Sequence, residues 1–289
     1  MIMMSTVRRS SVVALCASVG LVLGSLGGSA SAAEATVGLG TAGSYVVLAG
    51  TTVTNTGPST VQGSLGVSPG SEVTGFPPGV VSNGSIHAAD AEALNAQAAV
   101  TTAFNDAAGR SSTGAISADL AGMTLIPGVY TGGELALSGT LTLDGKGDPN
   151  AVFVFQAAST LVTGSSSKVS LTGGAAACNV FWQVGSSATI GTSSSFVGTV
   201  LALTSIAAKT DASIQGRLLA RNGAVTLESN TFSLPSCRSV GTTTQPGGGT
   251  DIPSTGGRVG VTFAAAMVAV LVGGSMVIGV RRSTRVPKS

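Results

Sequence analysis

The stretch from Cys178 to Phe232 decides the fold: CNVFWQVGSSATIGTSSSFVGTVLALTSIAAKTDASIQGRLLARNGAVTLESNTF. Its short apolar runs alternate with Gly, Ser, Asn and Thr and recur about every 18 residues. Self-similarity at such a period, in runs rich in β-branched and aromatic residues, predicts a β-solenoid with three strands per turn. One coil cannot bury its apolar edge alone, so neighbouring coils must stack. The three interleaved series are Trp182, Leu201 and Leu219; Ile190, Ile206 and Val225; and Phe196, Ile214 and Phe232.

The composition fits a fold made of many tight turns. The chain has 289 residues, of which 42 are Gly, 9% are charged and 4% are aromatic. So few charges, together with abundant apolar residues, exclude an ordinary disordered chain. Residues 33–251 hold seven basic and twelve acidic groups, a formal net charge of −5, and nothing in this balance suggests a nucleic-acid partner.

Residues 88–108 predict one long helix. They lack Gly and Pro, are rich in Ala, and end at Gly109. At about 1.5 Å per residue the helix is roughly 31 Å long, the height of several stacked coils, so it should lie along the solenoid axis. We expect its packing face to carry Leu94, Ala98, Thr101 and Phe104.

One strand series is apolar on both sides, which predicts that the helix covers its outer side. The sequence assigns one column to Phe155, Trp182, Leu201 and Leu219 and the other to Val154, Phe181, Val200 and Leu218. The two other faces of the solenoid are then left for water or for a partner.

Residues 1–32 are typical of a secretory signal peptide. Arg8 and Arg9 precede an apolar run, and Ala30-Ser31-Ala32 offers a cleavage site after Ala32. A membrane-spanning start is the alternative. The exported domain is then expected at 33–237, followed by a flexible Gly- and Thr-rich linker at 238–251.

Residues 252–289 resemble a cell-wall sorting signal. The pentapeptide IPSTG ends in Thr255 and Gly256, between which a sortase would cleave, although Ile252 replaces the usual Leu. An uncharged segment at 259–280 is long enough to span a bilayer, and a basic tail follows it. The arrangement predicts a cell wall or surface location in a Gram-positive-type bacterium, and a plain membrane anchor is the alternative.

Two cysteines remain once the signal peptide is removed. Two cysteines in an exported chain favour a disulfide between Cys178 and Cys237, with Cα atoms within about 7 Å of each other. Two free thiols are the alternative.

Six segments of the chain closely resemble the microbial ice-binding protein family. They are TVTNTGPSTVQGSLGVSPG (52–70), GFPPG (75–79), IHAADAEALNAQ (86–97), LTLDGKGDPNAVFVFQ (141–156), CNVFWQVGSSATIGT (178–192) and GRLLARNGAVTLESN (216–230). The resemblance covers about residues 36–237. It implies a discontinuous right-handed β-helix of triangular section, with one long helix alongside and coils that do not stack in sequence order.

The same resemblance implies that any ice binding uses a flat, uncharged face, often rich in Thr. The face after the helix-covered one offers Thr52, Thr54, Thr189, Ser205 or Ala207, and Thr226, with Lys209 and Glu228 at its edge. The third face offers Ser195, Ser213 and Thr231. The alternative for each of these residues is an ordinary solvated β-surface.

Catalysis, a cofactor and a metal are not expected. His87 is the single histidine and is expected to cap or turn the helix start, and no nucleophile–base pair is visible. Asp144 and Asp148 lack the later acidic ligand of a calcium loop and predict a turn. Two functions remain: a wall-displayed ice-binding protein, or an adhesin that uses the same scaffold to bind a polysaccharide or another surface.

Overall fold

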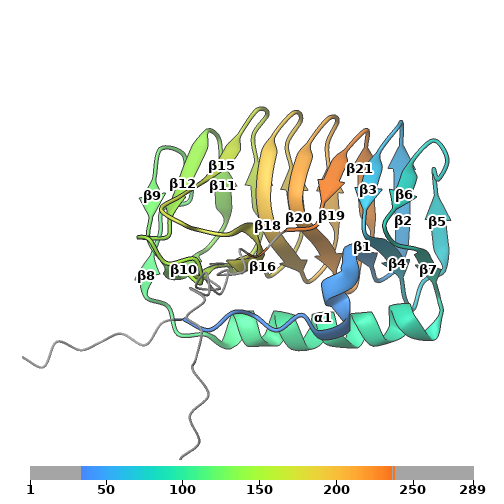
Figure 1. Cartoon of the computed structure of the whole chain (residues 1–289), viewed down its shortest axis with the longest axis horizontal. Coiled ribbons are helices and arrows are strands. Elements are labelled where there is room, and N and C mark those ends of the chain that lie inside the picture. The colour runs from blue at the N-terminus through green and yellow to red at the C-terminus, as the bar shows by residue number, and fades with distance from the viewer. Residues whose placement is uncertain (1–33, 236, 238–289) are drawn as a thin grey trace, which may run out of the picture. The chain divides into compact units, whose positions relative to one another are not determined.

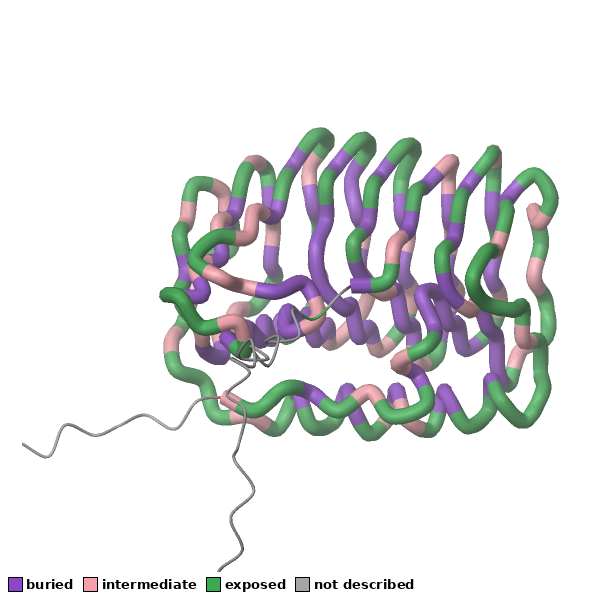
Figure 2. The backbone as a smooth tube through the Cα atoms, viewed as in Figure 1, coloured by how far each residue is buried: buried purple, intermediate pink, exposed green. Residues whose placement is uncertain are grey.

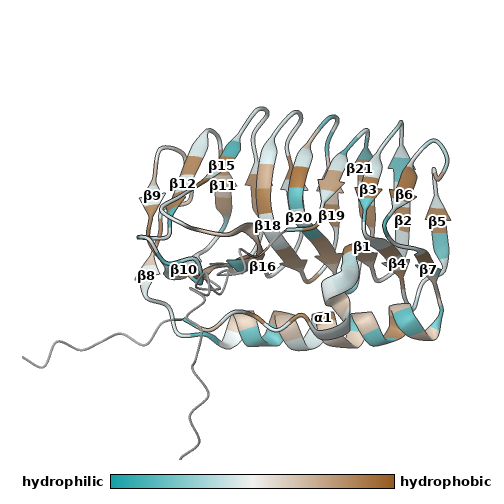
Figure 3. Ribbon diagram, viewed as in Figure 1, coloured by the Kyte–Doolittle hydropathy of each residue, from teal (hydrophilic) through white to brown (hydrophobic). Residues whose placement is uncertain are grey.

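The computed structural model describes residues 34–235 and 237, and these residues form a coil of parallel strands with one long helix beside it (Figure 1). Apolar residues concentrate in the strands, whereas the corners between strands are paler or teal (Figure 3). Three strands follow one another in each turn of the coil, as the period of about 18 residues predicts, and each strand pairs with its counterparts in the neighbouring turns.

The strands fall into three series. The first, under the helix, contains β8 (Gly114–Ala115), β10 (Gly128–Gly132), β13 (Phe153–Ala157), β16 (Val180–Val184), the C-terminal parts of β18 (Ser195–Ala202) and β20 (Ser213–Ala220), β1 (Tyr45–Ala49), β4 (Ser64–Val67) and β7 (Ile86–Ala88). The second is the seven-stranded sheet of β11 (Leu135–Leu137), β14 (Leu161–Thr163), β17 (Ala188–Ile190), β19 (Ile206–Ala208), β21 (Val225–Glu228), β2 (Thr52–Thr56) and β5 (Glu72–Thr74). The third contains β9 (Thr124–Leu125), β12 (Thr140–Asp144), β15 (Lys168–Thr172), the N-terminal parts of β18 and β20, β22 (Thr231–Ser233), β3 (Thr60–Gln62) and β6 (Val80–Ser82).

The coils do not stack in sequence order. Strands β1, β2 and β3 pair with β20, β21 and β22, so the N-terminal coils extend the C-terminal end of the stack. Strands β7 and β8 therefore lie at opposite ends, and α1 (Ala91–Gly109) runs along the stack between them (Figure 1). This pairing confirms the discontinuity that the family resemblance implied.

The helix α1 packs through a different face from the one expected. Asp90 caps its N-terminus by accepting a hydrogen bond from the Ala93 N–H at 2.8 Å. Leu94 is 58% exposed and Ala98 is exposed, so the predicted face was wrong apart from Phe104. Small side chains let the helix backbone approach the sheet closely, and alanines therefore take the buried stripe. Its buried residues are Ala93, Ala96, Gln97, Val100, Ala103, Phe104 and Ala107.

Two glutamines fasten α1 to the strands beneath it. Gln156 of β13 donates to the carbonyls of Ala107 and Arg110, at 2.8 and 2.9 Å, and so satisfies acceptors that a helix C-terminus leaves open. Gln97 of α1 donates to the Ala220 carbonyl at 3.0 Å.

The apolar columns under the helix shift by one residue from the predicted register. Trp182 pairs with Val200, which pairs with Leu218, whereas Leu201 and Leu219 pack on the outer side with the helix. The predicted columns therefore exchanged Val200 with Leu201 and Leu218 with Leu219. Both sides of these strands are buried, so the hydrophobic pattern does not specify the register here.

In the second series one predicted residue lies outside its column, whereas the third series has the predicted column. Ile206 pairs with Ala188 and Val225, whereas Ile190 pairs with Ala208, two residues after Ile206. Phe196, Ile214 and Phe232 form one column, as predicted, because the outward residues of that series are mostly exposed or half-buried, with Val197 an exception.

Aromatic side chains stack inside the coil. The Phe155 and Trp182 rings lie 4.0 Å apart at 12°, with Tyr130 and Phe196 on either side. The Trp182 indole N–H donates to the Val197 carbonyl at 3.0 Å, which satisfies a polar atom that would otherwise be buried without a partner.

The corner between the second and third series explains the 18-residue repeat. Ser193, Asp211 and Ser229 stand 18 residues apart in sequence and share a left-handed backbone, with φ of 53°, 59° and 52°. The same reversal of direction thus recurs once per coil. Figure 2 shows these corners largely exposed and the strands between them largely buried.

The predicted disulfide is present. Cys178 lies in the 3-10 turn η2 (Ala177–Asn179), and its Cα atom is 5.3 Å from that of Cys237. A second 3-10 turn, η1 (Gly40–Ser44), precedes β1.

The signal peptide, the linker, the sorting signal and the apolar segment 259–280 lie outside the described residues. Over residues 34–235, no helix combines the length and apolar character needed to cross a membrane.

Candidate ligand-binding face

One outward column runs along the whole seven-stranded sheet. In six of the seven strands buried residues alternate with exposed or half-exposed ones, and in β5 a half-buried Val73 lies between two exposed residues, so every second side chain faces away from the core. Strand pairing places one outward residue per strand side by side. In spatial order this threonine column is Ala136, Val162, Thr189, Ala207, Thr226, Thr54 and Thr74.

The threonine column contains no charged side chain. Neighbouring parallel strands lie about 4.8 Å apart, so its side chains repeat at that distance over seven strands. Backbone hydrogen bonds join each strand to its neighbour on one or both sides, and buried side chains fill the interior of the coil. The column is therefore a regular and preorganised surface.

The predicted residues of this face divide into two groups. Thr54, Thr189, Ala207 and Thr226 lie in the threonine column. Ser205 does not, because it precedes β19 and its hydroxyl accepts a hydrogen bond from the Ala224 N–H at 3.2 Å.

Thr52 also lies outside the threonine column, opposite Glu72 of β5. The sequence reading missed Ala136, Val162 and Thr74. Thr74 was detectable, because it occupies the outward position of EVT as Thr54 does in TVT. Val162 stands 27 residues before Thr189, and loop insertions between these coils obscure the period.

Lys209 and Glu228 neutralise each other at the edge of this face, where the sequence predicted them. Lys209 Nζ lies 3.4 Å from Glu228 Oε1, and the Thr210 hydroxyl donates to Glu228 Oε2 at 3.0 Å. The Thr210 hydroxyl and, next to it, the Lys209 ammonium hold the pKa of the Glu228 carboxyl below 4.5. This ion pair therefore adds little net charge to the rim, although Glu72, opposite Thr52, is an exposed acid on the same face.

The third face carries a less uniform column. Ser195, Ser213 and Thr231 lie side by side, as predicted. The column extends to Thr60 and Val80 in one direction, but Lys168 interrupts it beside Ser195 in the other.

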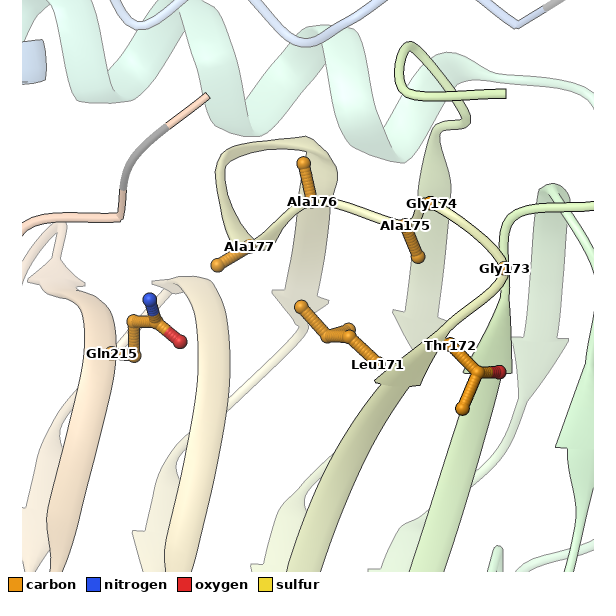
Figure 4. Close-up of a pocket in the computed structure, with 8 residues that line it drawn as sticks. All are labelled: Leu171, Thr172, Gly173, Gly174, Ala175, Ala176, Ala177 and Gln215. Atoms are coloured by element: carbon orange, nitrogen blue, oxygen red, sulfur yellow. The ribbon is translucent and has the colours of Figure 1, made fainter. Parts of the chain in front are cut away.

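A hollow of about 340 Å³ lies where the loop after β15 passes in front of the coil (Figure 4). Leu171, Thr172, Gln215 and the Gly and Ala residues of 173–177 line it. None of these side chains ionises or can act as a nucleophile at neutral pH apart from the weakly reactive threonine hydroxyl, so the lining offers no acid–base pair.

The remaining sequence expectations concern a turn and the start of α1. Asp144 and Asp148 accept hydrogen bonds from the backbone N–H groups of Lys146 and Asn150, which confirms the turn. Asp90, not His87, caps the helix, because its carboxylate directly precedes the first turn. His87 instead lies in β7, beside Tyr45, whose pKa is raised to about 12 by burial and by the nearby carboxylates.

Comparison with known proteins agrees with this architecture. The family model described as Ice-binding-like matches residues 47–233. An ice-binding protein of Nostoc sp. (strain HG1) is 53% identical over 201 residues, covering 68% of this chain and 73% of that protein. An ice-binding protein of Colwellia sp. is 36% identical over 233 residues, covering 74% and 91%.

Solved structures show the same fold. The crystal structure of an ice-binding protein from an Antarctic biological consortium is 51% identical, with a TM-score of 0.69, and the match covers 71% of this chain and 93% of that one. That of the Antarctic ascomycete Antarctomyces psychrotrophicus is 46% identical, with a TM-score of 0.66, and covers 68% and 97%. The chain belongs to the ice-binding-like family.

Proposed function

We propose that this protein adsorbs to ice through the threonine column of the seven-stranded face. The observation that carries the proposal is the unbroken register of seven uncharged outward positions, four of them threonine. The relatives named as ice-binding proteins support the choice of ligand.

The chemistry of the column suits a crystalline water surface. Each threonine presents a hydroxyl that can join a water lattice and a methyl group that cannot. Ala136, Val162 and Ala207 add further small apolar contacts. Many weak contacts add up only if the surface is already ordered, because ordering side chains on binding costs free energy. Side chains fixed by a β-sheet meet that condition.

The experiment compares two faces of one molecule. Thr226→Tyr places a bulky ring in the threonine column, and Ser213→Tyr places the same ring on the third face as a matched control. We expect the parent and Ser213→Tyr to shape ice crystals and slow recrystallisation, and Thr226→Tyr to lose both effects. Circular dichroism should show all three folded. Loss of activity only in Ser213→Tyr would assign the activity to the third face.

A polysaccharide is the second candidate ligand. The third face favours it, because Gln62 and Gln215 are exposed beside Thr60 and Ser213 and offer amides for hydrogen bonds to sugar hydroxyls. A glycan array distinguishes the two functions: binding that Ser213→Tyr abolishes, without any effect of the protein on ice, would support an adhesin.

The proposal includes display on a Gram-positive-type cell wall. The signal peptide at 1–32 and the signal at 252–289 support it, with sortase cleavage between Thr255 and Gly256. Mass spectrometry of wall-released protein should find a chain that begins near residue 33 and ends at Thr255. A C-terminal fragment that still contains the basic tail would support a plain membrane anchor.

The right-handed sense and triangular section of the coil also belong to the proposal. Three strand series per turn give three sides. Parallel strands joined by crossovers are right-handed in about 98% of cases. A crystal structure would test both features.

A further inference from the structure

The apolar interior of the coil reaches the surface at one end of the stack. The last strands there are β5, β6 and β7, and within the described residues each of them pairs on one side only (Figure 1). Their inward residues, Val73, Val81 and Ile86, pair with residues of the next coil that are completely buried. Val73 and Val81 are nevertheless only half-buried, and Ile86 is 43% exposed. We call residues 72–88 the open end.

At the opposite end the chain covers its own interior. The segment before β9 crosses the edge of β11, where the Leu120 N–H donates to the Ala136 carbonyl and the Ala136 N–H donates to the Ala118 carbonyl. Leu120 is completely buried, and the inward residues Leu135 and Leu125 are 1% and 8% exposed. Head-to-tail stacking of two chains would therefore press an uncovered core against a covered one.

The surface of the open end is apolar and carries little charge. A hollow of about 390 Å³ lies there, with Phe76, Pro77, Val80 and Ile86 in its lining. Val80 is 56% exposed. Among residues 69–89, Glu72 is the single Asp, Glu, Lys or Arg. An exposed apolar surface with so few charges is typical of a place where another protein binds.

The edge of β5 is complementary to a second copy of itself. When two open ends meet about a two-fold axis through Val73, the two β5 strands run antiparallel. Glu72 of one copy then lies opposite Thr74 of the other, where its carboxylate can accept a hydrogen bond from the hydroxyl. Like charges are therefore not placed directly opposite each other. The same axis places β6 of one copy on β7 of the other, so Val81 and Ile86 of the two copies continue one core.

We propose that this protein forms a head-to-head dimer through the open end. Two-fold symmetry closes the dimer, and the covered far ends prevent growth into a filament. The two seven-stranded sheets then meet edge to edge, and the dimer presents one face twice as long as that of a single chain. Any gain in ice adsorption rests on the proposed function, whereas the dimer itself does not.

The size of the open end predicts a weak dimer. One turn of three short strands offers roughly a few hundred Å², less than the ~800 Å² per partner of a standard interface. We therefore expect a dissociation constant on the order of 10–100 µM.

Sedimentation equilibrium of the full chain tests the proposal. We expect the parent to be mostly monomeric at about 5 µM and mostly dimeric at about 500 µM. Ile86→Lys puts a charge into the open end and should weaken the dimer at least 10-fold. Val80→Lys should do the same from a side chain that faces away from the core, so the result does not depend on the folding of one variant. Ile126→Lys, at an isoleucine that is 50% exposed near the other end, is the matched control and should associate as the parent does.

A cysteine variant tests the two-fold arrangement. Val73→Cys places a thiol of each copy at the axis, where directly opposite Cα atoms of an antiparallel pair lie about 4.5–5.5 Å apart, within reach of a disulfide. Mild oxidation should link Val73→Cys into covalent dimers and leave Ala207→Cys, in the middle of the same sheet, unlinked. A parent that stays monomeric at the highest concentration, association that both lysine variants leave intact, or no covalent dimer of Val73→Cys would overturn the proposal.

Discussion

Loss of the Cys178–Cys237 bridge should lower stability mainly through the unfolded chain. The bridge closes a loop with a sequence separation of 59, for which the chain-entropy relation gives about 4 kcal/mol at 25 °C. In the folded state β22 pairs with both β20 and β3, so the bridge protects no free strand edge. The last strand before Cys237 is therefore interior, and loss of the bridge is not expected to loosen a terminal coil.

For a folded domain of this size, about 4 kcal/mol corresponds to a fall in melting temperature of roughly 10 °C. Calorimetry should compare the parent with the Cys178→Ser/Cys237→Ser double variant, each with and without a reductant. The reductant should lower the melting temperature of the parent to that of the double variant and leave the variant unchanged. Melting temperatures within 2 °C of each other for all four samples, roughly half a kcal/mol, would refute the reasoning.

Three further substitutions test the packing and the edge of the face. Trp182→Phe removes the indole donor to the Val197 carbonyl and should lower the free energy of unfolding, measured in urea, by about 1–3 kcal/mol. An unchanged free energy of unfolding would show that this hydrogen bond is dispensable. Ala103→Leu should cost about 1–3 kcal/mol by overpacking the contact between helix and sheet, whereas Leu94→Ala, on the exposed side, should stay within about 0.5 kcal/mol. The pKa of Glu228 is lowered on folding, so the ionised carboxylate stabilises the folded state above pH 4.5, and this stabilisation disappears as the pH falls through the folded pKa. Glu228→Gln should therefore have a lower melting temperature than the parent at pH 7 and the same melting temperature in acid. A difference in melting temperature that persists in acid would contradict this origin.

The sequence predicts the solenoid well where only one side of a strand is buried. Ile214 and Phe232 lie between polar neighbours and Phe196 follows Ser195, so period and register both follow from the pattern. After Trp182 the strands are apolar on both sides, and no pattern distinguishes Val200 from Leu201. The helix face fails for a related reason: the contact selects small side chains, whereas hydrophobic periodicity gives most weight to large ones such as Leu94.

In the candidate face, too, the sequence predicts neighbours that come from consecutive coils but not those that come from distant parts of the chain. Thr189, Ala207 and Thr226 come from consecutive coils, so an 18- or 19-residue spacing relates them. Thr54 stands beside Thr226 only because the N-terminal coils stack on the C-terminal ones, which no local pattern reveals.

Partition into a growing ice hemisphere tests the central claim most directly. The purified parent and the Ser213→Tyr variant should be enriched in the ice fraction, while Thr226→Tyr, with an unchanged circular dichroism spectrum, should stay in the liquid. Equal exclusion of all three proteins from ice, or equal enrichment of all three, would contradict ice binding through the threonine column.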